Sequence, residues 1–551
     1  MEIVRIYSAN DNDSSLAGLG FNNQSLRLWF DSFDFTQDKF THHRSGLCPS
    51  TEFISINSVT LTFERLRALF FWYTLIMKYR SIFIANLSEI ARPLVKLMNK
   101  ERAEGEVWED HWLCDRFLFS EVDDRILITP VPIEKDFFED ACRLMGYKNT
   151  VNWWPEKVGE SISEAILKDK QLLEKIVREI KPHSALSEVE GLRRGKGDGG
   201  IKINSYAATP EFMKLVGELR DMGLAFETPE IPEEKNRWVA GFFGSKAGFR
   251  QAIASLGKDF PAMPQGGICS NKEETIGWAS YLLRNTAGCV IKANRGLAGA
   301  GLRIIKREEV RDVKNIREYL KRIIESERYW SFSEGFSGAL NAPNIAFDAV
   351  VVEEYIPADM SVCGGNPNIE LMIPQDGRVK VLYPCGMWVT PEGNFRGIEF
   401  GKGAVQKEAA EILTKSGRHL GEYLEKMGYR GYFEIDYIPR SINEIYPIEA
   451  NLRRTGGTHA YELALRLLGK DFTEHYYVTT NNLYDTPGFK GKSYLELKGT
   501  LRELLYPIKG QKEGVILTII NLLQKGQLGY VVVGESKERV AQIEKEFLGK
   551  I

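Results

Sequence analysis

The chain has 551 residues, too many for one ordinary hydrophobic core, so we expect roughly three or four folding units. Lysine and arginine number 72 against 75 for aspartate and glutamate, and this near-balance gives no support to nucleic acid as a main partner. Hydrophobic residues make up 43% and charged residues 27%, which is typical of a globular protein in water.

Targeting and redox signals are absent from the sequence. MEIVRIYSANDNDSS has no apolar h-region and no small-residue cleavage site, so we predict no signal peptide. The most apolar run, residues 68–77, is shorter than the roughly 20 residues that span a bilayer, and we predict a buried helix there, followed by a strand at 81–87. The seven cysteines form no CxxC pair and the seven histidines no zinc spacing, so we expect buried, reduced thiols in a cytoplasmic protein.

Helix and strand patterns alternate along the first part of the chain. RILITPVP, residues 125–132, predicts a buried strand ended by proline, and the helical spacing after it stops at Gly146. GLRRGKGDGG, residues 191–200, is either a linker, which we favour, or a mobile loop that meets a ligand.

From a helix that starts near Thr209 to about residue 470, strands and helices continue to alternate, which predicts α/β layers. In SNKEETIGWASYLLRN we expect Ser270 to cap a helix and Glu273 to reach back to it. Beyond about residue 490, GVILTIINLL, GYVVVGE and SKERVAQIEKEFL predict a compact α/β cap.

VIKANRGLAGAGL contains the first candidate site. Lys292 lies on the strand before the loop, where it can contact an anion, while Gly296, Gly299 and Gly301 let backbone N–H groups approach the anion's oxygens. No GK[ST] precedes a helix, as a Walker loop requires, and a strand instead of a helix follows, which argues against a Rossmann turn. We expect a flexible phosphate lid between two strands, with a long glycine hairpin as the alternative.

VVVEEYIPADMSV ends an apolar strand with two carboxylates, Glu353 and Glu354. One of them can accept a hydrogen bond from an adenine amino group, while the backbone beside Tyr355 and Ile356 pairs with the ring edge. Asp359 lies far enough along to reach ribose hydroxyls. A solvated strand edge is the alternative.

GYFEIDYIPRSINEIYPIEAN is the strongest candidate. Glu434 and Asp436 share one face of a strand, and Glu449 and Asn451 share a face of the next, because side chains alternate along a strand. A short connection can bring Asp436 beside Glu449 and Asn451, and these oxygen ligands suit Mg²⁺. Arg453 follows and can bind phosphate or carboxylate oxygens. A surface ion-pair patch is the alternative.

In this order, the pieces resemble the ATP-grasp superfamily over about residues 240 to 470. GFFGSKAGFR is similar to the family segment that supplies a second nucleotide lysine, here Lys246. The resemblance implies ATP and Mg²⁺ as cofactors. It assigns Lys246, Lys292 and the loop glycines to the phosphates, Glu353 and Asp359 to adenine and ribose, Asp436, Glu449 and Asn451 to Mg²⁺, and Arg453 to the γ-phosphate.

The long N-terminal region, the ending NLRRTGGTH and the small C-terminal segment resemble the pheganomycin-type peptide ligases. The implied fold is α/β: a pre-ATP-grasp domain at 1–240, an ATP-grasp domain at 241–475 with a lid at about 270–352, and a small cap at 476–551. Two departures leave the ribose contact and the lid geometry open. Asp359 stands where relatives often have Glu, and NRGLAGAG is less glycine-rich than many lids.

The resemblance implies a carboxylate–amine ligase in which a substrate carboxylate attacks the γ-phosphate of ATP and an amine captures the acyl phosphate. Arg453, Lys292 and Asn451 would be the catalytic residues, and no covalent nucleophile is needed. An amino-acid-like carboxylate and an amine or peptide are the implied substrates, and a homodimer is left open. We expect the carboxylate substrate to be held by Arg454, Thr455, Gly456, Gly457 and His459, with a solvent-facing helix start as the alternative for His459.

Two rival functions remain from the sequence. The first is an ATP-grasp enzyme of other chemistry, a carboxylase or a carboxylate kinase, although no biotin-attachment motif such as AMKM occurs. The second is a nucleotide-binding regulator without catalysis, against which the complete metal and phosphate set argues.

Overall fold

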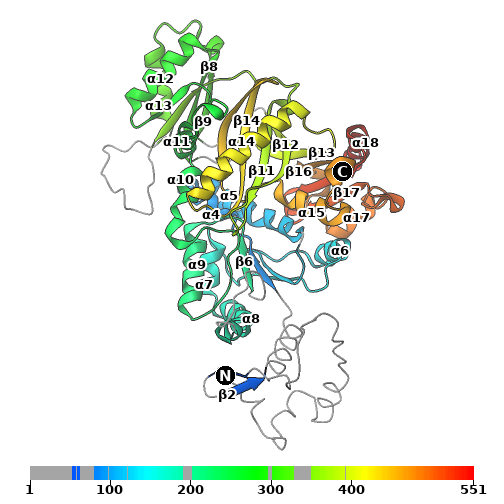
Figure 1. Cartoon of the computed structure of the whole chain (residues 1–551). Coiled ribbons are helices and arrows are strands. Elements are labelled where there is room, and N and C mark those ends of the chain that lie inside the picture. Colours follow the sequence, from blue (N-terminus) through cyan, green and yellow to red (C-terminus); the bar gives the residue numbers. More distant parts are fainter. Residues whose placement is uncertain are drawn as a thin grey trace, which may run out of the picture. The chain divides into compact units, whose positions relative to one another are not determined.

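The computed structural model describes residues 53–56, 59–62, 80–96, 98–120, 122–189, 201–295, 301–327, 330, 349–390 and 393–551. These belong to two compact units, residues 1–78 with 181–199 and residues 79–180 with 200–551. In the first unit, strands β1 (Phe53–Ile56) and β2 (Val59–Thr62) pair in antiparallel fashion. The predicted helix at 68–77 and the loop at 191–200 lie outside the described residues. The elements described below are drawn in Figure 1 and belong to the second unit, apart from residues 181–189 of one helix, which are counted with the first.

A parallel sheet begins the second unit. Its strands lie in the order β5 (Val151–Trp153), β4 (Arg125–Ile128), β3 (Ser81–Ile84) and β6 (Lys202–Ser205). Every residue of β3 and β4 is buried, as expected for parallel strands covered on both faces. The strand predicted at 125–132 and the helix after it are confirmed, because α6 (Lys135–Met145) ends at Gly146 in the left-handed conformation. Helices α4 (Ser88–Val95), α7 (Ile162–Lys168), α8 (Lys170–Val189) and α9 (Pro210–Asp221) complete this part.

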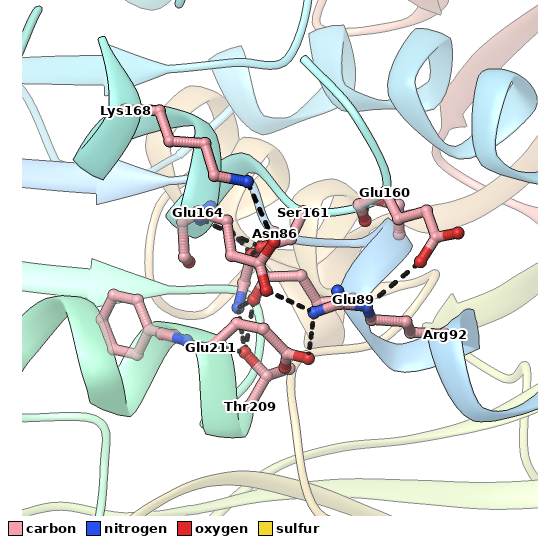
Figure 2. A network of polar contacts seen from close by, with 12 residues as sticks. Asn86, Glu89, Arg92, Glu160, Ser161, Glu164, Lys168, Thr209 and Glu211 are labelled. Atoms are coloured by element: carbon pink, nitrogen blue, oxygen red, sulfur yellow. Dashed lines mark hydrogen bonds and ion pairs between the residues drawn. The ribbon is translucent and has the colours of Figure 1, made fainter.

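A buried carboxylate occupies the place where the strand order of this sheet reverses. Glu89, which is 3% exposed, accepts hydrogen bonds from Ser161 Oγ at 2.7 Å, from the Ser163 N–H at 2.9 Å and from Asn86 Nδ2 at 2.9 Å (Figure 2). The Thr209 hydroxyl also donates to it. Parallel sheets often bind ligands at this place, but here the chain's own side chain takes it. Beside Glu89, one guanidinium serves three carboxylates: Arg92 pairs with Glu160, Glu164 and Glu211.

A second, antiparallel sheet corresponds to the predicted lid. Its strands lie in the order β7 (Gly266–Cys269), β10 (Val350–Glu354), β8 (Gly288–Ala293) and β9 (Leu302–Lys306). With α12 (Lys272–Asn285) and α13 (Ile316–Ser326) it encloses its own apolar core. Antiparallel pairing of β8 with β9 confirms the predicted strand–loop–strand order. The helix cap predicted at Ser270 and Glu273 is one residue early. Asn271 caps α12, and Glu274 accepts a hydrogen bond from the N–H of Ser270.

An eight-stranded antiparallel sheet forms the largest layer. Its strands lie in the order β15 (Glu444–Asn451), β14 (Gly431–Ser441), β11 (Pro367–Ile373), β12 (Lys380–Val389), β13 (Phe395–Gly401), β16 (Tyr477–Asp485), β18 (Gln527–Gly534) and β17 (Gly514–Ile519). The amphipathic helix α14 (Lys407–Lys426) packs on β11 and β12, and α18 (Lys537–Leu548) packs on β18. The residues predicted as a separate cap therefore supply three strands to this sheet.

The mixed α/β class expected from the sequence is confirmed, whereas the domain boundaries at 240 and 475 stay a prediction. Across the described part of the chain, no helix combines the length and the apolar character needed to cross a bilayer.

Candidate functional site

The two predicted acidic strands are neighbours in the large sheet. Across β14 and β15, Asp436 lies directly opposite Glu449, and Glu434 lies opposite Asn451. The Asn451 Nδ2 donates to Glu434 Oε1 at 3.0 Å and to Asp436 Oδ2 at 3.3 Å. The grouping of Asp436, Glu449 and Asn451 that the strand period predicts is therefore present.

Strand β11 adds two residues that the sequence reasoning missed. Asn368 lies opposite Asp436, and Glu370 lies opposite Glu434. The Asn368 amide donates to both Asp436 and Glu434, so it bridges their carboxylates. A signal was available in PNIELMI, where two polar residues share one face of an otherwise apolar strand.

Burial and mutual repulsion disfavour the charged forms of the carboxylates in this cluster. Burial raises the pKa of Asp436 well above its usual value, and the charges of Glu434 and Glu449 raise it further. Burial also raises the pKa of Glu434 to about 7, against the opposing effect of Arg453. Lys246 Nζ, 3.0 Å from Glu449 Oε1, supplies one positive charge. A divalent cation with oxygen ligands would complement this donor set.

The cluster is arranged around hydrogen bonds between its own side chains. Among the described residues, no three His, Cys, Asp or Glu side chains form a group that could hold a metal by themselves. The Asn451 amide turns its nitrogen to the carboxylates, and its oxygen accepts from Arg453 at 2.9 Å. For Asn451 to ligate a metal beside Asp436, its amide group would have to turn over.

Arg453 connects the cluster to the N-terminal part of the unit. Besides its bond to Asn451, it donates to the Tyr206 hydroxyl at 3.3 Å, and its guanidinium carbon lies 5.8 Å from the Tyr206 ring centroid. Tyr206 directly follows β6. The residue predicted to bind the γ-phosphate thus has the acidic cluster on one side and an aromatic ring on the other.

The two predicted nucleotide lysines are positioned by one segment. Lys246 begins α11 (Lys246–Leu256), which Ser245 caps. The N–H of Lys246 donates to the Asn294 carbonyl at 3.1 Å, and the N–H of Ala247 donates to Asn294 Oδ1 at 2.9 Å. Because Asn294 directly follows β8, which carries Lys292, movement of either lysine is coupled to the same stretch of backbone.

Lys292 is held in a buried ion-pair network with Glu353. Lys292 Nζ lies 2.5 Å from Glu353 Oε2, and Arg250 on α11 lies 2.9 Å from Glu353 Oε1. Burial of Glu353, which is 2% exposed, would raise its pKa, but the two cations outweigh burial and lower it. Any adenine contact by Glu353, which stays a prediction, would share oxygens that already serve Lys292 and Arg250.

The remaining predicted nucleotide residues follow β10. Ile356 is buried, whereas Glu354, Tyr355 and Asp359 are partly exposed. Asp359 accepts from the Ser361 N–H at 2.9 Å. Their adenine and ribose roles stay predictions.

Only one of the three predicted lid glycines is described. Gly301 has φ of 74°, a left-handed conformation that glycine adopts readily, and its carbonyl accepts from the Ala293 N–H at 2.7 Å. Gly296 and Gly299 lie outside the described residues.

Arg454, predicted to hold the carboxylate substrate, forms ion pairs with two carboxylates of the protein itself. It donates to Glu230 at 3.0 and 2.8 Å and to Glu462 at 2.6 Å. Its guanidinium carbon also lies 4.0 Å from the Tyr432 ring centroid. These contacts hold in place the stretch between β15 and α15 (Thr458–Leu468), and the substrate role of Arg454 stays a prediction.

The threonine and glycines after Arg454 are tightly packed. Thr455 Oγ1 donates to Glu370 Oε2 at 3.1 Å. A Cβ added at Gly456 would meet Phe395 Cε1 at 2.3 Å, and one added at Gly457 would meet Ile398 Cδ1 at 2.4 Å. These residues bring α15 close to the sheet, and their substrate role stays a prediction.

His459 is 3% exposed, so the solvent-facing alternative is wrong. Neither of its ring nitrogens has a hydrogen-bond partner among the described residues. It lines a cavity of about 10 Å³ together with Arg454 and Glu462.

The strand pair, the lysine-bearing loop and the lid sheet are the features by which the sequence resembles ATP-grasp enzymes. No family model matches the chain. Among curated proteins, it is similar to the L-propargylglycine–L-glutamate ligase of Streptantibioticus cattleyicolor, with 26% identity over 257 residues that cover 45% of this chain and 48% of the ligase. The match thus spans about half the length of that relative. It confirms the predicted resemblance as a similarity to a ligase of the ATP-grasp family.

Solved structures give two further likenesses. Biotin carboxylase from Campylobacter jejuni, in complex with β,γ-ATP, has 13% identity, covers 86% of this chain and 92% of its own, and has a TM-score of 0.48. N5-carboxyaminoimidazole ribonucleotide synthetase from Thermus thermophilus has 10% identity, coverages of 85% and 98%, and a TM-score of 0.46.

Proposed function

We propose that the protein is an ATP-dependent ligase that joins a substrate carboxylate to an amine and forms a peptide bond. One observation carries the proposal: Lys246, from a distant part of the chain, meets Asp436, Glu449, Asn451 and Arg453 at a single place. The similarity to a ligase whose name gives two amino acids as substrates supports amino acids here as well.

The residues fit ATP and Mg²⁺. Asp436 and Glu449 would hold the metal, because burial and mutual repulsion leave their carboxylates in need of a counter-charge, and Asn451 would join them once its amide turns over. Lys246 and Lys292 would hold phosphates, and the stretch from Glu353 to Asp359 would hold the nucleoside. Bound Mg-ATP supplies the phosphoryl group that activates the substrate carboxylate as an acyl phosphate.

The chain's own residues then orient and shield the reactants. Arg453 is held beside the cluster by Asn451 and Tyr206, where its charge would face a bound phosphate. The Asn294 contacts keep Lys246 and Lys292 in register with each other. The cluster is partly exposed, so bound reactants and the loop before Gly301 would have to complete the exclusion of water that an acyl phosphate needs.

A product assay tests the proposal. The full chain is given Mg-ATP with pooled amino acids and short peptides, and ADP, phosphate and amide products are followed by mass spectrometry. We expect ADP release that depends on both a carboxylate and an amine, with one amide formed per ADP. Acyl phosphate or hydroxamate without an amide would identify a carboxylate kinase, and bicarbonate-dependent ADP release would identify a carboxylase. Nucleotide binding without turnover would identify a regulator.

Asn451→Ala supplies the matched variant. We expect kcat to fall by about 10²–10³-fold with the fold intact, because a metal ligand and the Arg453 anchor are lost together. Asn443→Ala, an exposed position in the turn of the same hairpin, is the control. An unchanged rate for Asn451→Ala would remove Asn451 from the metal site.

A further inference from the structure

Arg116 is a buried cation without a counter-ion among the described residues. It lies on the short 3-10 helix Leu113–Leu118 (η2), directly after α5 (Lys100–Trp112), and is 4% exposed. Its Nε is enclosed and has no hydrogen-bond acceptor among the described residues. Its charge is felt by two buried acids, Asp110 and Asp115, whose pKa values it lowers. An unpaired charge in a protein interior is destabilising by several kcal/mol, so such a group is retained only where something compensates for it.

The nearest acids do not provide that compensation. Asp110, on α5, has its own Oδ2 without a partner, and burial raises its pKa to about 8, so it is largely protonated near neutral pH. Asp115 directs Oδ2 to the N–H groups of Ile520 and Asn521, at 2.7 and 2.9 Å. Arg116 lowers the pKa of both acids, but burial outweighs this effect, so neither is a fully ionised partner for the guanidinium.

Arg116 also shares an aromatic neighbour with Arg453. Its guanidinium carbon lies 5.8 Å from the Tyr206 ring centroid, the same distance as that of Arg453. Two guanidinium groups beside one ring repel each other, and an anion near them would relieve that repulsion. His459 adds a buried imidazole. Burial lowers its pKa and the charge of Arg116 lowers it further, against the smaller, opposite effect of a backbone contact with Gly456. The imidazole is therefore neutral and can donate a hydrogen bond to such an anion.

We propose that Arg116 binds the free carboxylate of the substrate that supplies the amine, an α-amino acid or a peptide with a free C-terminal carboxylate. The inference rests on the proposed ligase function. The carboxylate to be activated belongs beside Lys246 and the acidic cluster, where phosphate would be held. Arg116 shares the Tyr206 ring with Arg453, which borders that cluster, so it suits the second substrate, whose amine must face the activated group.

Stability and binding of the ligand-free chain give the first test. Thermal unfolding is measured for the full chain with free amino acids and dipeptides and, in parallel, with the matching α-amides, for example glycine against glycinamide. We expect at least one free acid to raise the melting temperature saturably, its amide to have no such effect, and Arg116→Gln to remove the difference. Arg116→Lys should restore part of it.

The variants also separate a binding role from a structural one. Without ligand, Arg116→Gln should unfold at the same temperature as the parent or higher, because an uncompensated buried charge is removed. A structural arginine would give a lower temperature. Arg102→Gln, an exposed charge on α5, is the control with the same change of net charge. Equal responses to acid and amide in the parent chain, or an unchanged difference in Arg116→Gln, would overturn the proposal.

Kinetics distinguish failure of this inference from failure of the proposed function. If the chain makes amides, Arg116→Gln should raise KM for the amine substrate about 10- to 100-fold and leave KM for the carboxylate substrate and for ATP nearly unchanged. An active Arg116→Gln variant with the parent KM refutes the Arg116 site alone. A chain that makes no amide, but still distinguishes acids from amides through Arg116, refutes the ligase proposal and keeps the anion site.

Discussion

Asp436 and Glu449 lie directly opposite each other on antiparallel strands, although like charges in that position destabilise a sheet. The repulsion is offset only in part. Lys246 forms an ion pair with Glu449, and the side-chain amides of Asn368 and Asn451 donate hydrogen bonds to Asp436. A pair that is kept despite this opposition is best explained by a ligand that needs both oxygens.

Asp436→Asn should therefore stabilise the ligand-free chain and inactivate it. The substitution removes both the cost of burying a carboxylate and its repulsion with Glu449. We therefore expect the free energy of unfolding at pH 8 to rise by roughly 1–2 kcal/mol. Urea unfolding with and without Mg-ATP measures this, and the added stability from Mg-ATP should vanish in the variant. Asp376→Asn, on an exposed turn, is the control. Loss of stability in ligand-free Asp436→Asn would contradict the explanation.

Lys292→Met should weaken both nucleotide binding and the fold of the lid. Glu353 keeps Arg250 but loses its shorter ion pair, which leaves a buried carboxylate half-neutralised, and we expect a loss of about 2–3 kcal/mol. The double variant Lys292→Met with Glu353→Leu should recover most of the stability without recovering nucleotide binding. Equilibrium unfolding and titration with ADP give the two readouts, and a double variant as unstable as the single one would refute the pairing.

Arg454→Lys should act on stability and not on substrate affinity. A lysine cannot reproduce the two parallel bonds to Glu230 together with the bond to Glu462, so we expect a loss of about 2–4 kcal/mol. Chemical denaturation measures it. A variant of parent stability whose KM for the carboxylate substrate rises would instead favour the substrate role predicted from the motif.

Stability should fall as pH rises from about 4 to 7, in part through Asp115. Burial raises the pKa of Asp115 from 3.8 to about 7, so in this window the native carboxyl keeps a proton that the unfolded chain releases, and higher pH favours unfolding. Asp115→Asn can still accept from the loop at Ile520 and should reduce the pH-dependent loss by roughly 2–4 kcal/mol.

A carboxylate with the opposite shift provides the control. Burial would raise the pKa of Asp123, but hydrogen bonds from its neighbours, including the Lys148 N–H, outweigh that effect and lower it. Its stabilising contribution is present at neutral pH and is lost as pH falls through its native pKa. Asp123→Asn should thus flatten the acid side of the profile and leave the loss of stability from pH 4 to 7 unchanged, and a change in that window instead would show that Asp115 is not its source.

The strands and their polar faces could be predicted because their patterns are local. A period of two places Glu434 with Asp436 and Glu449 with Asn451, and a short connection leaves little freedom in their pairing. Lys292 is predicted from its place on the strand before the glycine loop and Lys246 from the resemblance alone. The structure brings both to the same segment, and their roles stay predictions.

What escaped prediction depends on contacts distant in sequence. Arg454 and Glu230 are 224 positions apart, and no local pattern reveals that the guanidinium is already paired. Arg116 also gave no motif, although a charge inside WLCDRFLF was a usable sign, since buried charges need partners. The N-terminal cap of α12 was predicted one position too early, at Ser270 instead of Asn271. Ser and Asn are both good caps, so the sequence alone does not choose between them.

The three C-terminal strands β16, β17 and β18 belong to the large sheet, which limits where the chain can be cut into fragments. β16 pairs with β13 on one side and β18 on the other, so a protein cut after residue 475 would expose the full edge of β13, with its unpaired N–H and C=O groups. Such an edge recruits other chains. A truncated form would therefore be prone to self-association, and neither fragment would behave as a portable module, so exchange of parts with related enzymes should keep residues from β11 to the C-terminus together.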